Sequence, residues 1–584
     1  MYKKTLSFSH LKRFSPYLIH FKKEIGLALV LGIINGLSVV FMTFYIGKAV
    51  DTLLGKGQVN FQALFQIMAL LLGITLTTSV SQWLIQTLGN KVAYFSVADL
   101  RKDAFKQLNK LPLSYYDTHS HGDLMSRFSN DLDYVSDACT AIFNQLFSGV
   151  TIVVISLVSM VLLSPMLTLV VLISTFFIFL VNWLVATNSQ KRFSAQQKIV
   201  GDISGFLSET VTNQKIIKSF QYETNTQESF NTFNTELQQA GQKAQFISSL
   251  TNPLSRFVDH LGYLAIGLVG GLLAISNPGV ITIGIITSFI LYASQFSKPF
   301  IEISGMTTQI QTALAGLERV FQLMDEPIEK PTVALEQADF SSGQVTFQNV
   351  TFSYKKEQPL IQDFSLFVNP GETIAIVGKT GAGKSTLVNL LMRFYEVDSG
   401  DILIDGISIR HISRDTLRQS FGMVLQETWL FNGTIWDNLT FGKPDASLEE
   451  VVKACHDASI YHFIRTLPEG FQTKIGHGGL MISDGQKQLL TIARTMISQP
   501  KMLILDEATS SVDTLTEQSI QEAFFKMMEG KTSFVIAHRL STIKKADKIL
   551  VMEQGKIVEI GTHAALLAKP EGAYRTLYQA QYKH

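Results

Sequence analysis

The sequence predicts a membrane protein in which an all-α domain of six membrane-spanning helices is followed by an α/β domain. Of its 584 residues, 46% are hydrophobic and only 17% are charged. The mean hydropathy of +0.21 is too apolar for an ordinary soluble enzyme of this length. Charge-free stretches fill the first half, whereas short apolar strands alternate with helical segments in the second half. These patterns indicate membrane spans followed by a parallel-sheet domain.

Charge and cysteine content exclude several classes of protein. Lys and Arg total 49 and Asp and Glu total 48, so the net charge is +1. No overall electrostatic field therefore draws the chain to nucleic acid or anionic lipid. Cys139 and Cys455 are far apart in the sequence, and they offer neither a disulfide framework nor a metal cluster.

The charge-free stretches predict six spans. Residues 25–46 and 61–90 carry no charge, and each accommodates one helix of about 20 residues. Residues 138–190 are too long for one helix and are divided at Ser164-Pro165. Residues 261–297 are divided at 277–279 and are short for two crossings, so we expect the fifth helix to begin near Arg256 and Asp259. The expected spans are 25–46, 64–88, 140–163, 166–187, 255–276 and 281–303.

Lysine and arginine placement predicts the orientation. The first expected outer loop carries Lys56, and the breaks at Ser164-Pro165 and 277–279 carry no basic residue. Six basic residues lie in the N-terminal segment and six in the connection between the second and third spans. They are Lys3, Lys4, Lys12, Arg13, Lys22 and Lys23, and Lys91, Arg101, Lys102, Lys106, Lys110 and Arg127. We therefore expect a multi-pass protein of the cell membrane with both termini in the cytoplasm.

The long inner connections, 91–137 and 191–255, are polar but patterned as helices. Leu100, Phe105, Leu108 and Leu111 recur at helical spacing, which predicts helices that continue past the bilayer. A polar, proline-containing linker is expected over 324–342. It separates a membrane domain over 1–323 from a second domain over 343–584.

A glycine-rich loop lies between a predicted buried strand, 373–377, and a predicted helix that starts near Leu387. This context is typical of a phosphate-binding loop and predicts an α/β P-loop NTPase domain that binds the phosphates of a nucleotide together with Mg²⁺. We expect Lys384 to reach the β- and γ-phosphates and Ser385 to ligate Mg²⁺. The loop consists of Gly378, Lys379, Thr380, Gly381, Ala382, Gly383, Lys384, Ser385 and Thr386.

A second apolar strand, 501–505, ends in Asp506 and Glu507. An acid at the carboxyl end of a parallel strand faces the ligand crevice, so we expect Asp506 to hold Mg²⁺ or its water. Glu507 is then the candidate base that polarises the attacking water.

Together these motifs resemble those of the ATP-binding cassette (ABC) transporters, over nearly the whole chain. Seven stand in the family's order: the aromatic segment 352–354, the phosphate loop, Gln426, the signature-like 482–486, 505–510, 511–513 and 536–539. The resemblance implies that Tyr354 stacks on adenine and that Gln426 contacts Mg²⁺ and the attacking water. It also implies that His538 contacts the γ-phosphate and that Asp513 communicates between two cassettes. The signature residues, which face the phosphate held by the other cassette, are Ser483, Asp484, Gly485 and Gln486.

The first half resembles the membrane part of exporters whose six helices are fused to a C-terminal cassette. Segments 111–117 and 215–218 look like the two intracellular loops of that group. In such exporters, coupling helices on these loops lie in clefts of the cassettes, the second one on the partner chain. The resemblance implies a dimer of half-transporters, because each ATP site combines one chain's phosphate loop with the other's signature.

The expected cargo is a hydrophobic or amphipathic compound such as a drug or dye. The spans offer aromatic and amide groups without central charges, for example Gln82, Trp83 and Asn182, although helix packing accounts for these groups equally well. Alternatives are a lipid or another dedicated substrate, an importer with exporter architecture, and a channel or regulatory subunit. Glu507 and His538 argue against a purely regulatory cassette.

The signature departs from the family's usual Leu-Ser-Gly-Gly-Gln at Asp484. A carboxylate near the γ-phosphate places like charges together and weakens its stabilisation. A homodimer would carry this defect twice. We therefore predict a heterodimer with one competent ATP site, similar to the asymmetric bacterial multidrug exporters, and the alternative is a homodimer that tolerates Asp484.

Overall fold

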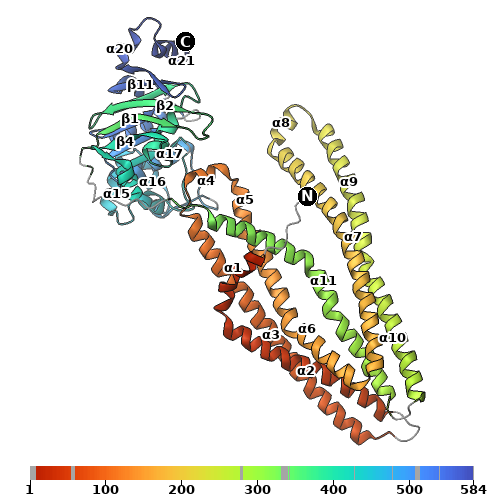
Figure 1. The fold of residues 1–584 in the computed structure, drawn as a ribbon. Coiled ribbons are helices and arrows are strands. Elements are labelled where there is room, and N and C mark those ends of the chain that lie inside the picture. The colour runs from red at the N-terminus through yellow and green to blue at the C-terminus, as the bar shows by residue number, and fades with distance from the viewer. Residues whose placement is uncertain are drawn as a thin grey trace. The chain divides into compact units, whose positions relative to one another are not determined.

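A computed structural model describes residues 8–53, 59–276, 280–329, 340, 342–426, 428–476, 478–506, 513–537 and 539–582. The chain divides into two compact units, which Figure 1 draws in one ribbon. The first comprises Met1–Lys110 and Ser120–Glu326. The second comprises Pro327–His584 together with the short segment Leu111–His119.

The first unit is entirely helical, and the predicted all-α membrane domain is confirmed as to its fold class. Its helices are α1 (Phe8–Ile19), α2 (Lys22–Thr52), α3 (Phe61–Leu108), α5 (His121–Ser126), α6 (Leu132–Leu163), α7 (Pro165–Thr212), α8 (Gln214–Ser219), α9 (Glu223–Ser249), α10 (Thr251–Ser276) and α11 (Ile283–Asp325), with a π-helical turn at Arg127–Asp131. Within the described ranges, five segments are long and apolar enough to cross a membrane: Lys22–Thr52, Phe61–Leu108, His121–Leu163, Pro165–Thr212 and Glu223–Ser276. The sixth predicted span falls in α11, which is not among those five, and it stays a prediction.

Local signals explain where several of these helices begin and end. Ser164 is the N-cap of α7, accepting a hydrogen bond from Leu167 N, and Pro165 takes the first helical position, so the predicted break at this dipeptide is confirmed. The helix predicted from Leu100 and its neighbours continues unbroken to Leu108. Leu111 lies beyond that end and precedes another helix, so the pattern overestimates the length of α3 by one turn.

Small residues let α2 approach α11 closely at one end. A Cβ built on Gly47 would lie 2.4 Å from the Gly284 carbonyl oxygen, and one on Gly284 would lie 2.1 Å from that of Gly47. Beside this contact Asp51 Oδ1 accepts from Gly284 N at 2.7 Å, while Oδ2 accepts from the Thr282 hydroxyl at 2.8 Å. The carboxylate therefore satisfies one backbone donor and one hydroxyl at the start of α11.

The second unit is the predicted α/β domain. A six-stranded sheet has the order β12-β11-β3-β10-β9-β6, and a four-stranded sheet has the order β2-β1-β4-β5. The strands are β1 (Val345–Phe352), β2 (Ile361–Val368), β3 (Thr373–Gly378), β4 (Ser399–Ile404), β5 (Ile407–Ser408), β6 (Phe421–Val424), β7 (Gly433–Thr434), β8 (Lys474–Ile475), β9 (Met502–Asp506), β10 (Thr532–Ile536), β11 (Lys548–Glu553) and β12 (Lys556–Gly561). The helices are α4 (Leu113–Thr118), α12 (Lys384–Leu391), α13 (Arg414–Ser420), α14 (Ile435–Leu439), α15 (Leu448–Asp457), α16 (Tyr461–Thr466), α17 (Asp484–Ile497), α18 (Thr514–Met528), α19 (Leu540–Lys545), α20 (His563–Leu567) and α21 (Ala573–Tyr582).

Strands β3 and β9 of the six-stranded sheet are buried on both faces, which explains their uninterrupted apolar sequences. On β3, Ile374 and Ile376 face one core cluster, whereas Ala375 and Val377 face the other. All four side chains are at most 7% exposed. The central strand is thus held rigidly from both sides, and the loop that follows it starts from a fixed position.

Candidate nucleotide site

The phosphate loop has the strand-to-helix context that the sequence predicts. β3 ends at Gly378 and α12 begins at Lys384. Two loop glycines adopt left-handed conformations, Gly381 at φ +82° and Gly383 at φ +96°. Residues with a Cβ rarely adopt such angles, and a Cβ on Gly383 would lie 2.8 Å from Ile361 Cδ1. Glycine is therefore required for the curvature that directs the loop around a phosphate-sized group.

Lys384 is positioned by its own loop. Its Nζ donates to the carbonyl oxygens of Gly378 at 2.8 Å and Lys379 at 3.1 Å. Burial lowers the pKa of Lys384 from its ordinary value, and the nearby Asp506 carboxylate opposes this change. A half-buried ammonium group held inside a curved backbone loop is well suited to bind an anion.

Most other predicted ligands follow neighbouring parallel strands. β3, β10, β9 and β6 are adjacent and parallel, so their carboxyl ends meet at one edge of the sheet. Asp506 ends β9, and Gln426 comes two residues after β6. The structure therefore brings Asp506 and Gln426 to the edge that carries the phosphate loop. Glu507 and His538 lie outside the described residues.

Tyr354 lies just beyond the end of β1 and is 48% exposed. Its hydroxyl donates to Thr386 Oγ1 at 3.4 Å and accepts from Asn389 Nδ2 at 3.1 Å. Both partners belong to α12, the helix that follows the phosphate loop. The exposed ring is consequently held beside the loop, where a base attached to bound phosphates can stack on it.

The signature-like segment begins a different helix. Ser483 is the N-cap of α17 and forms a capping box with Gln486, in which each side chain accepts from the other residue's backbone N–H. Ser483 and Asp484 are exposed, whereas Gly485 is buried. Asp484 pairs with Lys487 at 2.9 Å. α17 begins directly after Ser483, which leaves the serine and the acid at the surface.

Two family models match this chain. Residues 25–300 match the ABC transporter transmembrane region, and residues 361–510 match the ABC transporter model. The chain belongs to the ABC transporter family. It is an exporter-type half-transporter, with one membrane region and one ATP-binding cassette, and it hydrolyses ATP to drive transport.

Relatives of known name extend along nearly the whole half-transporter. A "Fatty acid ABC transporter ATP-binding/permease protein" of Mycobacterium tuberculosis is 43% identical over 526 residues, which is 90% of this chain and 83% of the relative. A "Putative multidrug export ATP-binding/permease protein" of Bacillus subtilis is 35% identical over 594 residues, covering 98% of each chain. A protein of the same description from Staphylococcus aureus is 34% identical over 583 residues, covering 98% of this chain and all of the relative.

The residues at the sheet edge fit the family's nucleotide. The left-handed glycines, the Lys384 ammonium group and the α12 N-terminus are complementary to phosphate charge. The Ser385 hydroxyl and the Asp506 carboxylate are oxygen ligands of the kind that a small divalent cation prefers. When bound, ATP supplies the free energy of phosphoanhydride hydrolysis. The chain's own residues bind and orient its phosphates.

Asp513 has a structural function that the sequence comparison did not suggest. It is the N-cap of α18, and its carboxylate accepts from Thr516 N at 3.0 Å. This hydrogen bond lowers the pKa of Asp513, so the group stays ionised. The exposed carboxylate thus stabilises its own helix and also remains available at the surface of the cassette.

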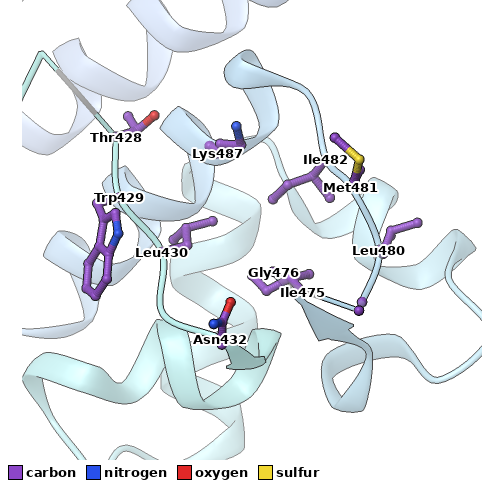
Figure 2. A pocket seen from close by; sticks show the side chains of 12 residues that line it. Thr428, Trp429, Leu430, Asn432, Ile475, Gly476, Leu480, Met481, Ile482 and Lys487 are labelled. Carbon is purple, nitrogen blue, oxygen red and sulfur yellow. The ribbon is translucent and has the colours of Figure 1, made fainter. Parts of the chain in front are cut away.

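A pocket of about 530 Å³ lies between the segment that follows Gln426 and the segment that leads into α17. Figure 2 shows Thr428, Trp429, Leu430 and Asn432 on one side and Leu480, Met481 and Ile482 opposite them, with Lys487 beside both. Trp429 is 62% exposed and Met481 is 94% exposed. An apolar surface of this kind beside the signature is typical of an interaction site.

Sequence reasoning missed three residues near the predicted site. They are Asn389, which donates to Tyr354, Lys487, which pairs with Asp484, and Tyr395, whose ring contacts Tyr354 with 4.9 Å between centroids. The i,i+3 spacing of Asp484 and Lys487 on a predicted helix was a signal that could have identified that pair. No sequence signal links Tyr395 or Asn389 to Tyr354.

Proposed function

We propose that this half-transporter works as one subunit of a heterodimeric exporter, which moves hydrophobic or amphipathic compounds such as drugs or dyes out of the cytoplasm. Six spans cross the cell membrane, and both termini and the cassette are cytoplasmic. In this proposal Glu507 polarises water, and His538 and Gln426 contact the γ-phosphate region. Ser385, Gln426 and Asp506 hold Mg²⁺ or its water.

The separation of the two halves of the site carries the proposal. The phosphate loop, Gln426 and Asp506 share one sheet edge, whereas Ser483 and Asp484 lie exposed at the start of α17. A second cassette is the natural partner for exposed groups at a helix N-terminus. Because Asp484 introduces a negative charge there, an ordinary signature on a different chain gives this phosphate loop its competent site.

The pocket beside α17 supports a partner of the same architecture. Its exposed Trp429 and Met481 offer an apolar surface, and α8 with its flanking residue offers exposed Ile216 and Phe220. We infer that this pocket receives the corresponding helix of the partner half-transporter. Burying such side chains stabilises an assembly by roughly 25 cal/mol per Å².

A fatty acid is the second candidate cargo. The observation that favours it is the 43% identity to the mycobacterial fatty acid transporter. A single-chain fatty acid is amphipathic, which is compatible with the uncharged, aromatic-rich spans, and it also suits the alternative of a homodimer with a dedicated substrate. The direction in which labelled fatty acid moves tests whether the protein is instead an importer with exporter architecture.

Reconstitution separates these possibilities. The chain is purified alone and with any half-transporter encoded beside it, and each sample is placed in vesicles with outward-facing cassettes. The heterodimer proposal predicts copurification in equal amounts and ATP-dependent uptake of several unrelated dyes. A strong, drug-stimulated ATPase from this chain alone would contradict the heterodimer. Movement of labelled fatty acid without movement of dyes would favour the second cargo, and its direction separates export from import.

A further inference from the structure

Tyr395 lies between the nucleotide site and the segment Leu111–His119, which belongs to the same compact unit as the cassette. Its ring meets the Tyr354 ring edge to face, with centroids 4.9 Å apart and planes at 89°. It also contacts the Phe352 ring, with centroids 5.7 Å apart. Its hydroxyl donates a hydrogen bond to the Asp117 carboxylate on α4. One side chain thus contacts both the candidate adenine-stacking ring and a helix from the membrane half of the sequence.

The nucleotide end of this connection is well anchored. Tyr354 is bound through its hydroxyl to Thr386 and Asn389 of α12, and Tyr395 follows the same helix by four residues. Aromatic pairs of this geometry contribute about 0.5–1.5 kcal/mol and depend on ring orientation. A base that stacks on Tyr354 fixes the orientation of that ring and consequently restricts Tyr395.

The α4 end is anchored as well. Leu111 and Tyr115 are each 6% exposed, and the Tyr115 ring stacks on His119 with centroids 4.1 Å apart. Asp117 is exposed apart from its bond to Tyr395. Burial, and then the hydrogen bond to Asp117, raise the pKa of Tyr395 far above its ordinary value. The phenol therefore stays protonated and donates at every pH at which the transporter works.

We propose that Tyr395 is a positioning residue that couples nucleotide occupancy at Tyr354 to the order and orientation of α4 through its hydrogen bond to Asp117. The inference rests on the proposed binding of ATP at this site and goes beyond it, because it assigns the residue through which the membrane half senses that binding. A coupling of this kind is reciprocal: if ATP orders α4, then loss of the α4 contact alters ATP binding by the same free energy.

The test measures backbone hydrogen exchange of α4 in the full-length transporter with its partner, with and without a non-hydrolysable ATP analogue. In the wild-type protein the analogue should slow exchange of residues 113–118 by about fivefold or more. Tyr395→Phe, which keeps the ring but removes the hydroxyl, should reduce this effect below about twofold. Asp117→Ala should do the same. Peptides of the phosphate loop should remain protected in both variants, which shows that the analogue still binds.

Three controls keep the test decisive. Asp117→Asn retains an oxygen that accepts from the tyrosine and should preserve most of the protection. Tyr461→Phe removes a tyrosine hydroxyl elsewhere in the cassette and should change nothing. Tyr395→Phe and Asp117→Ala remove the same hydrogen bond. The double variant should therefore lose no more of the α4 protection than either single variant.

Two results would overturn the inference: an unprotected α4 in the wild-type protein with analogue bound, or full α4 protection in Tyr395→Phe. Absence of any protection at the phosphate loop would instead contradict the proposed nucleotide site itself. As a second readout, transported molecules per ATP hydrolysed should fall in Tyr395→Phe, and the KM for ATP should rise by about two- to fivefold, which is the reciprocal of the lost protection of α4. A change in KM alone would assign Tyr395 a purely local function in nucleotide binding.

Discussion

Replacing Asp484 by glycine should raise the ATPase rate of this chain purified alone, because the proposed assembly of two copies places the phosphate loop of one copy opposite the signature of the other. Two like unit charges about 7 Å apart repel by about 2.4 kcal/mol at an effective dielectric constant of about 20. The Lys487 ammonium group, 2.9 Å from the Asp484 carboxylate, offsets part of this repulsion. We take about 1 kcal/mol as the remainder, because exposed pairs are strongly screened. Removing that repulsion from the transition state raises the rate about fivefold.

Lys487 provides the matched control. Lys487→Met removes the compensating charge, so it should lower the rate in the wild-type background. The assay is phosphate release by the chain in lipid nanodiscs at several ATP concentrations. Thermal unfolding is measured in parallel, because glycine in the first turn of α17 costs the helix roughly 0.5–1 kcal/mol and loses a favourable acidic residue worth about 0.3–1 kcal/mol. An unchanged rate in a folded Asp484→Gly protein, or a faster rate in Lys487→Met, would refute the electrostatic reasoning.

Further predictions concern binding, thiol chemistry and stability. Lys384→Ala should weaken ATP binding at least about tenfold, because hydrogen bonds to charged groups contribute about 1.5–3 kcal/mol. Glu507→Gln should keep ATP binding and remove most hydrolysis. Nucleotide titration measures the first effect, and phosphate release measures the second. Burial raises the pKa of Cys455 to about 12, so a maleimide at pH 8 should label it far more slowly in the folded cassette than in urea, and equal rates would contradict its burial. The same raised pKa contributes stability that is present below the unfolded value of about 8.5 and is lost as the pH rises toward 12. Arg319→Ala should lower the free energy of unfolding by about 2 kcal/mol, because it leaves the Asp131 carboxylate, whose side chain is only 3% exposed, without its partner Arg319. Adding Asp131→Asn should recover part of this stability, as measured by thermal unfolding.

The parts of the site that the sequence predicted are those in which the strand and its ligand are contiguous. The phosphate loop follows β3 directly, and Asp506 ends β9, so an apolar run followed by a polar residue was sufficient to place both. Parallel pairing then brings them to one edge without any further information. The break at Ser164-Pro165 was predictable for the same reason, since an N-cap and a first-turn proline are adjacent in the sequence.

Contacts between distant segments were not predictable in this way. Segment Leu111–His119 is bordered on both sides by the helical unit, yet it packs with the cassette. Tyr395 meets Asp117 across 278 positions of sequence, and its neighbour Tyr354 across 41. Each of these residues alone reads as an ordinary surface tyrosine or acid. Their function depends on a juxtaposition that composition and periodicity do not contain.

Asp484 shows how the structure adds to a residue that the sequence identified. From the sequence alone its carboxylate is a negative charge near the γ-phosphate, which weakens the stabilisation of that phosphate. In the structure the same residue is the first of α17, where the helix dipole favours a negative charge, and Lys487 neutralises part of that charge one turn later. Both effects hold the carboxylate in place while they reduce the field that reaches the other cassette. We therefore predict that the site which Asp484 faces is slowed rather than abolished, with Lys487 setting the degree, and a paired substitution at positions 484 and 487 separates these two outcomes.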